Sequence, residues 1–369
     1  MPLMGIQTKS HILSVAFSKN SSEIVSGSDA HTVEIWDAAT GLALQHLDGH
    51  TNEVNAVAFS SDGTSIVSGS DDKSVRVWDT STGAELYQLN GHTDRVKSVA
   101  FSPDDTYIVS GSCDKSVRVW DASTGVELQQ LNGHIDWVRC VAFSYDGTCI
   151  ISSSDDKSIR IWDASIGTEL QQLNGHTDRV NSIAFSHDGT HIVSGSHDKS
   201  VRIWDALTGV ELQKLNGHTD FVNSVAFSYD GIHIVSCSDD KSVRLWNAST
   251  GAELQKFNGH IEFINSVAFS HDGIHIVSGS DDKSIRVWDA LTGPKIQNLN
   301  GHTSWVRSVA FSPDSTCIIS SADDESIKMW NVSTGEEMHT LNGHTHEIHS
   351  VAFSHDGTRI VSGSDDKSV

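Results

Sequence analysis

The residue types of a nucleophilic triad recur at fixed spacing in this chain. His92, Ser110 and Asp114 are one example, and a histidine, a serine and an aspartate can together activate a serine hydroxyl for attack on a substrate. The same set stands in seven equivalent places along the sequence. Because an active site needs one pocket of special geometry, seven equivalent copies predict a structural role, and we expect the protein not to be an enzyme.

Histidine and aspartate are also metal ligands, and the chain has 21 histidines. The densest group is His344, His346 and His349 beside Glu347. A zinc site needs three or four ligands that converge at about 2.0–2.3 Å, whereas solvated loop histidines need no such convergence. The Asp-Asp pairs, such as Asp71-Asp72, lack the ligand spacing of a calcium-binding EF-hand loop. We therefore predict no metal site and no cofactor.

A repeat of 42 residues organises these motifs. Gly-His pairs occur at this period from Gly49-His50 to Gly343-His344, and a tryptophan follows each glycine by 29 positions, from Trp78 to Trp330. Trp36 stands in phase before them. Eight copies without insertion or deletion indicate a repeat architecture.

One repeat, residues 91–132, predicts four short antiparallel strands. Alternating β-formers place strands at residues 96–101, 107–110, 116–121 and 127–131, with turns between them. In most other repeats the first turn contains Asp-Gly, a dipeptide that strongly favours a hairpin. Four strands of this length cannot bury both of their faces alone, so we expect neighbouring repeats to stack on each side.

Composition limits the partners and the compartment. The formal charge is −23 and no run of lysine or arginine offsets it, which argues against nucleic acid as a partner. No apolar run could cross a bilayer, and residues 1–7 lack the features of a signal peptide. Five cysteines without a C-x-x-C spacing suit a reducing compartment. We expect a cytoplasmic protein with no membrane partner.

Gly-His followed by Trp-Asp at this spacing resembles the tryptophan–aspartate (WD) repeat family of β-propellers. In that family the histidine, serine, aspartate and tryptophan of one unit join in a hydrogen-bonded chain. The resemblance implies the same structural role for the matching tetrads, which include His50, Ser68, Asp72 and Trp78, His92, Ser110, Asp114 and Trp120, and His176, Ser194, Asp198 and Trp204. The first unit departs from the pattern at Thr8 and Ala30, and the last has His344, Ser362 and Asp366.

The predicted fold is therefore an all-β, WD-repeat β-propeller of four-stranded antiparallel blades. Residues 1–8 form a lead-in, and residues 9–369 form the propeller, with eight complete repeats and a partial ninth at 343–369. Leaving the last hairpin alone would expose an apolar face, which favours one ring of eight or nine blades. Seven blades is the alternative, because seven tetrads are complete.

The columns in which repeats differ point to function. The column four residues after the repeat glycine reads Glu53, Arg95, Trp137, Arg179, Phe221, Phe263, Trp305 and Glu347. A core position would keep one size of apolar residue, so this column is expected to be exposed. Two places later stand residues that include Arg139 and Arg307, and a turn column adds Asp71, Cys113, Asp155, His197 and Asp239. The resemblance places all three columns on one rim of the ring, where partners dock.

We accordingly predict a non-catalytic interaction scaffold or sensor that binds a protein or peptide. The predicted partner-binding residues are Arg95, Trp137, Arg139, Arg179, Phe221, Phe263, Trp305 and Arg307, because exposed aromatic residues and arginines dominate many interfaces. A glycan-binding propeller is the alternative, although equivalent glycan sites would repeat one aromatic residue. The near-identical repeats also resemble the C-terminal sensor arrays of signal-transducing NTPases, which implies an upstream nucleotide-binding domain in a longer parent chain.

Overall fold

The computed structural model describes residues 12–18, 23–28, 31–37, 43–290, 295–354 and 357–365. The chain divides into two compact units: unit 1 comprises residues 1–172 and 354–369, and unit 2 comprises residues 173–353. Every regular element in the described residues is a strand, and none of them is a helix that could span a membrane.

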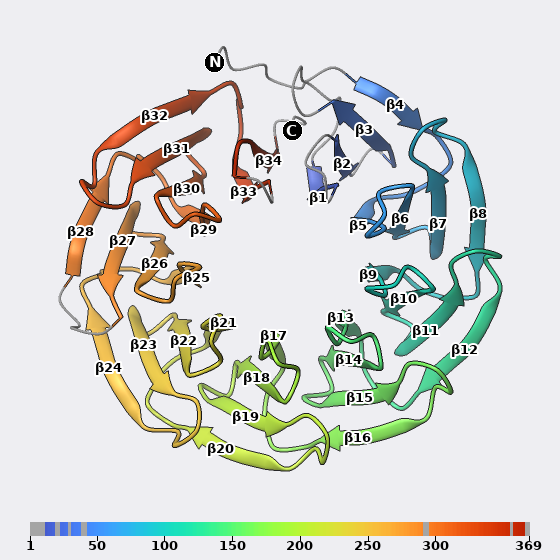
Figure 1. The fold of residues 1–369 in the computed structure, drawn as a ribbon, viewed down its shortest axis with the longest axis horizontal. Coiled ribbons are helices and arrows are strands. Elements are labelled where there is room, and N and C mark those ends of the chain that lie inside the picture. Colours follow the sequence, from blue (N-terminus) through green and yellow to red (C-terminus); the bar gives the residue numbers. More distant parts are fainter. Residues whose placement is uncertain are drawn as a thin grey trace. The chain divides into compact units, whose positions relative to one another are not determined.

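Eight four-stranded antiparallel sheets follow one another along the chain, and we call them blades 1 to 8 (Figure 1). The strands of blades 1 to 4 are β1 (Ile12–Phe17), β2 (Glu23–Ser28), β3 (Val33–Asp37), β4 (Ala43–Leu47), β5 (Val54–Phe59), β6 (Ser65–Ser70), β7 (Ser74–Asp79), β8 (Glu85–Asn90), β9 (Val96–Phe101), β10 (Tyr107–Ser112), β11 (Ser116–Asp121), β12 (Glu127–Asn132), β13 (Val138–Phe143), β14 (Cys149–Ser154), β15 (Ile159–Asp163) and β16 (Glu169–Leu173).

The strands of blades 5 to 8 are β17 (Val180–Phe185), β18 (His191–Ser196), β19 (Val201–Asp205), β20 (Glu211–Leu215), β21 (Val222–Phe227), β22 (His233–Ser238), β23 (Ser242–Asn247), β24 (Glu253–Asn258), β25 (Ile264–Phe269), β26 (His275–Ser280), β27 (Ser284–Asp289), β28 (Lys295–Asn300), β29 (Val306–Phe311), β30 (Cys317–Ala322), β31 (Ser326–Asn331) and β32 (Glu337–Asn342). The last repeat contributes β33 (Ile348–Phe353) and β34 (Ile360–Ser364), and in unit 1 β34 lies against β1.

The strands predicted for residues 91–132 are confirmed, with β10 two residues longer and β12 one residue longer than predicted. Each strand pairs with the next along the chain because short turns join them. Lys115 and Gly125 carry two of these turns in blade 3 with φ of 75° and 70°, a backbone conformation that tight turns require. Three residues named above for the first and last repeats lie outside the described residues: Thr8, Ala30 and Asp366.

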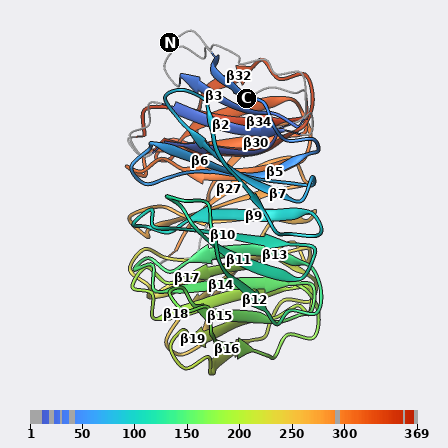
Figure 2. The ribbon, with the colours of Figure 1, turned by 90° about the vertical axis from the view of Figure 1, so that its right-hand side faces the viewer.

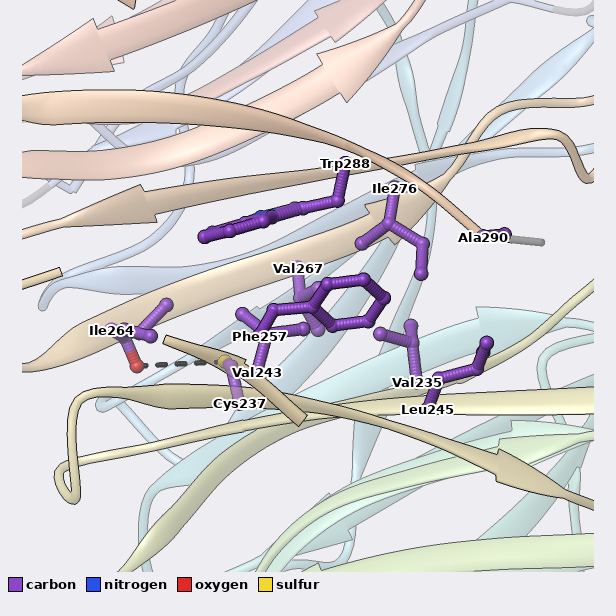
Figure 3. Close-up of a cluster of buried hydrophobic side chains, with 10 residues drawn as sticks. All are labelled: Val235, Cys237, Val243, Leu245, Phe257, Ile264, Val267, Ile276, Trp288 and Ala290. Carbon is purple, nitrogen blue, oxygen red and sulfur yellow. Dashed lines mark hydrogen bonds between the residues drawn. The ribbon is translucent and has the colours of Figure 1, made fainter. Parts of the chain in front are cut away.

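The core lies between successive blades. Figure 3 shows one cluster, in which Val235, Leu245 and Phe257 of blade 6 pack against Ile276 and Trp288 of blade 7. The second and third strands of a blade are buried almost throughout, as in β6 and β7, because a neighbouring blade covers each face. Neighbouring repeats therefore stack on each other, as expected for strands too short to bury both of their faces alone.

The turns of each blade lie at the two ends of its strands (Figure 2). We call one end the rim end: it carries the loop that precedes the first strand and the turn between the second and third strands. The other end, the hairpin end, carries the turn between the first and second strands and the turn between the third and fourth. Within each unit, the first strands of successive blades lie side by side, so equivalent loops become neighbours.

Candidate interaction surface

A hydrogen-bonded chain inside each blade joins the four residues of the predicted tetrad. In blade 3, Trp120 Nε1 donates to Ser110 Oγ at 2.9 Å, and Ser110 Oγ lies 2.8 Å from His92 Nε2. His92 Nδ1 lies 2.8 Å from Asp114 Oδ2. Because the carboxylate only accepts, Nδ1 carries the hydrogen and Nε2 accepts from the serine. Ser110 is fully buried, so its hydroxyl is not presented to solvent as a nucleophile.

The same contacts occur in seven blades, around His50, His92, His134, His176, His218, His260 and His302. Burial alone would raise the pKa of Asp114, but the hydrogen bonds from His92, Ser116 and the Thr93 amide outweigh it, so the pKa of Asp114 lies well below its ordinary value. A second serine, Ser116, also donates to this carboxylate at 2.7 Å. The aspartate is thus an ionised acceptor that holds the turn to the strands.

The arginine of the third strand explains the glycine that precedes six of the seven tetrad histidines, and in blade 8 Lys328 stands in its place. Arg118 forms a partly buried ion pair with Glu127 of the fourth strand, and its Nη1 would lie 2.6 Å from a Cβ at Gly91. Sequence reasoning missed this pair. Its signal is the arginine that recurs two residues before the tryptophan, together with the glutamate that opens the fourth strand.

Three columns meet at the rim end of blades 2 to 8. We call them the rim column (Glu53, Arg95, Trp137, Arg179, Phe221, Phe263, Trp305, Glu347), the inner column (Asn55, Lys97, Arg139, Asn181, Asn223, Asn265, Arg307, His349) and the turn column (Asp71, Cys113, Asp155, His197, Asp239, Asp281, Asp323). The amide of each turn-column residue donates to the carbonyl of the rim-column residue in its own blade, at 2.8–3.0 Å. The backbone therefore fixes these columns side by side, including Asp281 and Asp323, which the sequence analysis had left out.

Exposure divides the predicted partner-binding residues into two groups. Phe263 and Trp305 are 43% and 45% exposed, and Arg139 and Arg179 are exposed as well. Arg95, Trp137, Phe221 and Arg307 are only half-buried or partly exposed, which differs from the expectation that the whole set would be exposed. The reason is that these side chains cover one another.

Trp137 is the centre of one such group in unit 1. The guanidinium carbons of Arg95 and Arg139 lie 5.0 Å and 4.9 Å from the centre of its ring, so two cations contact one aromatic side chain. Arg139 also forms a two-pronged ion pair with Asp155, at 3.0 Å and 2.6 Å. The structure thus brings together three of the predicted partner-binding residues, and their mutual contacts hold them in place.

Unit 2 has two further groups. Arg179 Nε lies 3.2 Å from the ring nitrogens of His197, and the His197 ring stacks on Phe221 with centroids 4.0 Å apart. Arg307 lies 4.8 Å from the Trp305 ring centre and forms a two-pronged ion pair with Asp323. No pattern in the repeats indicated that aromatic and basic residues of the rim would pair with each other.

The inner column has a structural task that sequence reasoning missed. Asn265 Nδ2 donates to Asp281 Oδ1 at 2.7 Å and to the carbonyl of Val306 in the next blade at 3.0 Å. Asn55 and Asn223 make the equivalent pairs of bonds. An asparagine recurs in this column because it joins its own turn to the neighbouring blade.

The turn-column carboxylates differ in their counter-charges. Asp71 pairs with Lys97 at 2.8 Å, and Asp155 and Asp323 pair with arginines. Asp239 and Asp281 are held by asparagines, and neither forms an ion pair in the described part of the chain. Burial raises the pKa of Asp281, and the nearby charges of Asp323 and Asp239 raise it further. The hydrogen bond from Asn265 and the charge of Arg307 lower the pKa, but they do not outweigh burial. Among the described residues, blades 6 and 7 therefore place two carboxylates that form no ion pair beside Phe221 and Phe263.

Comparison with known proteins places this geometry in a family. The family model described as WD domain, G-beta repeat matches nine segments, residues 5–37, 41–79, 83–121, 125–163, 167–205, 209–247, 251–289, 293–331 and 335–369. The crystal structure of the computationally designed Ika8 protein is similar, with 35% sequence identity and a TM-score of 0.73, over 88% of this chain and 98% of that chain. The comparison with curated proteins gives no match. The chain belongs to the WD-repeat family of β-propellers, with about eight to nine blades of four antiparallel strands.

Proposed function

We propose that the rim end of the blades binds a protein or peptide, and that this partner places a basic segment on blades 6 and 7. WD-repeat propellers are generally protein-interaction scaffolds and are usually non-catalytic. The observation that carries the proposal is the group formed by Phe221, Asp239, Phe263 and Asp281, which we call the acidic–aromatic sector. It offers two carboxylates without an ion pair next to two aromatic rings.

The other blades support this assignment by contrast. Where a turn-column aspartate stands in blade 2, 4 or 8, a lysine or arginine of the chain itself neutralises it. In blades 6 and 7 an asparagine of the inner column holds the carboxylate, as Asn55 does in blade 2, but no lysine or arginine pairs with that carboxylate in the described residues. A lysine or arginine from a partner would supply the missing cation, and it would also lie near the face or edge of a phenylalanine.

Phe263 gives this sector an apolar contact area, and Trp305 adds a second exposed aromatic ring in the next blade. Both are more than two-fifths exposed, and both stand within the rim column of unit 2. Large aromatic side chains rimmed by charge often carry much of the binding energy of an interface. The formal charge of −23 would also speed the approach of a basic partner.

A sensor role in cytoplasmic signal transduction fits this surface. The near-identical repeats resemble the C-terminal arrays of signal-transducing NTPases, so an upstream nucleotide-binding domain of a longer parent chain is one candidate for a partner. The proposed surface does not depend on that parentage, because its chemistry rests on the rim residues alone.

Affinity capture followed by titration tests the proposal. The captured partner is titrated by calorimetry against wild-type protein, Asp281→Asn and Trp305→Ala. Glu336→Gln and Tyr145→Ala are matched controls, because they remove one charge and one exposed aromatic ring from the hairpin end. We expect each rim variant to weaken binding by about tenfold or more and the controls to leave it unchanged. Equal affinities for all variants, or capture of glycans alone, would reject the proposed surface.

A further inference from the structure

At the hairpin end, the turn between the first and second strands presents two consecutive backbone amides, and blade 2 shows what they bind. Ser61 N and Asp62 N donate to the two carboxylate oxygens of Asp105, at 2.6 Å and 2.9 Å. Asp105 lies in the equivalent turn of blade 3, with φ of 59°. One side chain of the chain therefore acts as a carboxylate ligand for the turn of its neighbour.

Blade 7 repeats this contact with a weaker acceptor. His271 N and Asp272 N donate to Ser315 Oγ, at 3.0 Å and 3.4 Å. Ser315 stands in the turn of blade 8 with φ of 61°, at the position that Asp105 occupies in blade 3. Two independent repeats thus show that this pair of amides takes an oxygen from outside its own blade.

In blade 6 the corresponding acceptor side chain is missing from the sequence. The equivalent amides are those of Tyr229 and Asp230, and the equivalent acceptor position in blade 7 is Gly273, with φ of 72°. A Cβ built on Gly273 would have no atom within 4 Å, so the space that the side chain of Asp105 fills in blade 3 is open here. Neither amide donates to another residue in the described part of the chain.

The surroundings of these two amides are aromatic and apolar. The Tyr229 ring lies 4.2 Å from the His187 ring and 4.5 Å from the His271 ring, measured between centroids. Tyr229, Ile232 and Ile274 are each about half exposed, and Ile274 directly follows Gly273. A ligand that reaches the amides would therefore also contact apolar surface.

We propose that the amides of Tyr229 and Asp230 bind a carboxylate carried by a peptide, with an apolar side chain of that peptide on Ile232 or Ile274. The charge of Asp230 does not prevent this. Its carboxylate accepts hydrogen bonds from Ser228 Oγ and from the amide of Ile232, as Asp62 accepts from Ser60 and Thr64 in blade 2. In blade 2 the carboxylate of Asp105 binds beside that same arrangement.

Selective labelling makes the site directly observable. The chain has four tyrosines, so ¹⁵N-tyrosine labelling gives four backbone amide resonances, and replacing Tyr229 by phenylalanine assigns the one of interest. We would titrate N-acetyl-isoleucine, its C-terminal amide, and an amidated peptide that contains glutamate. The proposal predicts a saturable downfield shift of the Tyr229 amide with the free carboxylate and none with the isoleucine amide. A shift with the glutamate peptide identifies a side-chain carboxylate as a second source.

Two variants separate binding from unrelated changes. Gly273→Asp should reproduce the contact of Asp105, so the Tyr229 resonance should move downfield without ligand and no longer respond to it. Gly273→Ala places a Cβ at the same positive φ without an acceptor and should keep the ligand response. Absence of any Tyr229 shift at the highest soluble ligand concentration would overturn the proposal, as would an unchanged response in a folded Gly273→Asp protein.

Discussion

Replacing His176 by alanine tests whether the buried tetrads hold the blades together. The imidazole is 1% exposed, and its two nitrogens lie 2.7 Å from Ser194 Oγ and 2.9 Å from Asp198 Oδ2. Alanine removes both hydrogen bonds and leaves a buried carboxylate with fewer donors. At about 0.5–1.5 kcal/mol for each hydrogen bond, the loss of unfolding free energy should be about 1–3 kcal/mol.

Urea unfolding followed by tryptophan fluorescence measures this loss, since Trp204 belongs to the same tetrad. His346→Ala removes an exposed histidine and serves as the control. Ser194→Ala and the double variant complete a double-mutant cycle, and we expect the two changes to be less than additive because they break one shared bond. An unfolding midpoint that does not move in His176→Ala, or full additivity, would refute the structural role of the tetrad.

The same variant has a pH signature. Burial would raise the pKa of Asp198, but the hydrogen bonds from His176 and Ser200 outweigh it, so the folded pKa lies below the unfolded value of about 3.9. A carboxylate with a depressed folded pKa stabilises the fold fully above the unfolded pKa and progressively less as the pH falls below it. As the pH falls from about 5 to about 2, the free energy of unfolding should therefore decline less for His176→Ala than for wild type.

Further outcomes follow from the rim and from the net charge. Trp305→Ala should change stability by no more than about 0.5 kcal/mol because its side chain is 45% exposed and one arginine contacts the ring. Trp137→Ala should lose about 1–2 kcal/mol because that side chain is partly buried and two arginines contact the ring; thermal melts compare the two variants. Asn265→Ala should lose about 1–3 kcal/mol in urea unfolding, since it breaks a bond within blade 7 and one to blade 8, and a neutral result would contradict the role assigned to the inner column. Duplex DNA should show no tight or sequence-specific binding in fluorescence anisotropy at physiological salt, given a charge of −23.

The fold could be predicted from the sequence because its constraints repeat. A strand pattern that is ambiguous in one unit becomes firm when the 42-residue period presents it eight times, as the agreement in residues 91–132 shows. The tetrads could be matched for the same reason: His92, Ser110, Asp114 and Trp120 keep their spacing in seven units, and their contacts follow from that spacing.

The arrangement of the rim could be predicted only in part. Variation among repeats marked Trp137 and Trp305 as unusual for a core position, but nothing in the variation showed that Arg95 and Arg139 would contact the first of these rings. The contact of Arg95 depends on how blade 3 lies against blade 4, which no single column encodes. The partners of Asp71, Asp239 and Asp281 also required the structure, because each partner depends on which inner-column residue reaches the carboxylate.

Hydrogen-exchange mass spectrometry of the partner-bound protein tests the central claim most directly, because it maps a bound surface without assuming which residues matter. With the partner bound, peptides that span residues 219–223, 239–241, 261–265 and 281–283 should gain protection, since they carry the acidic–aromatic sector at the rim end. The hairpin-end turn of blade 2, whose two amides already bind Asp105, serves as the internal reference and should exchange as before. Protection confined to hairpin-end turns or to the outer strands β24 and β28, with the rim peptides unchanged, would contradict the account.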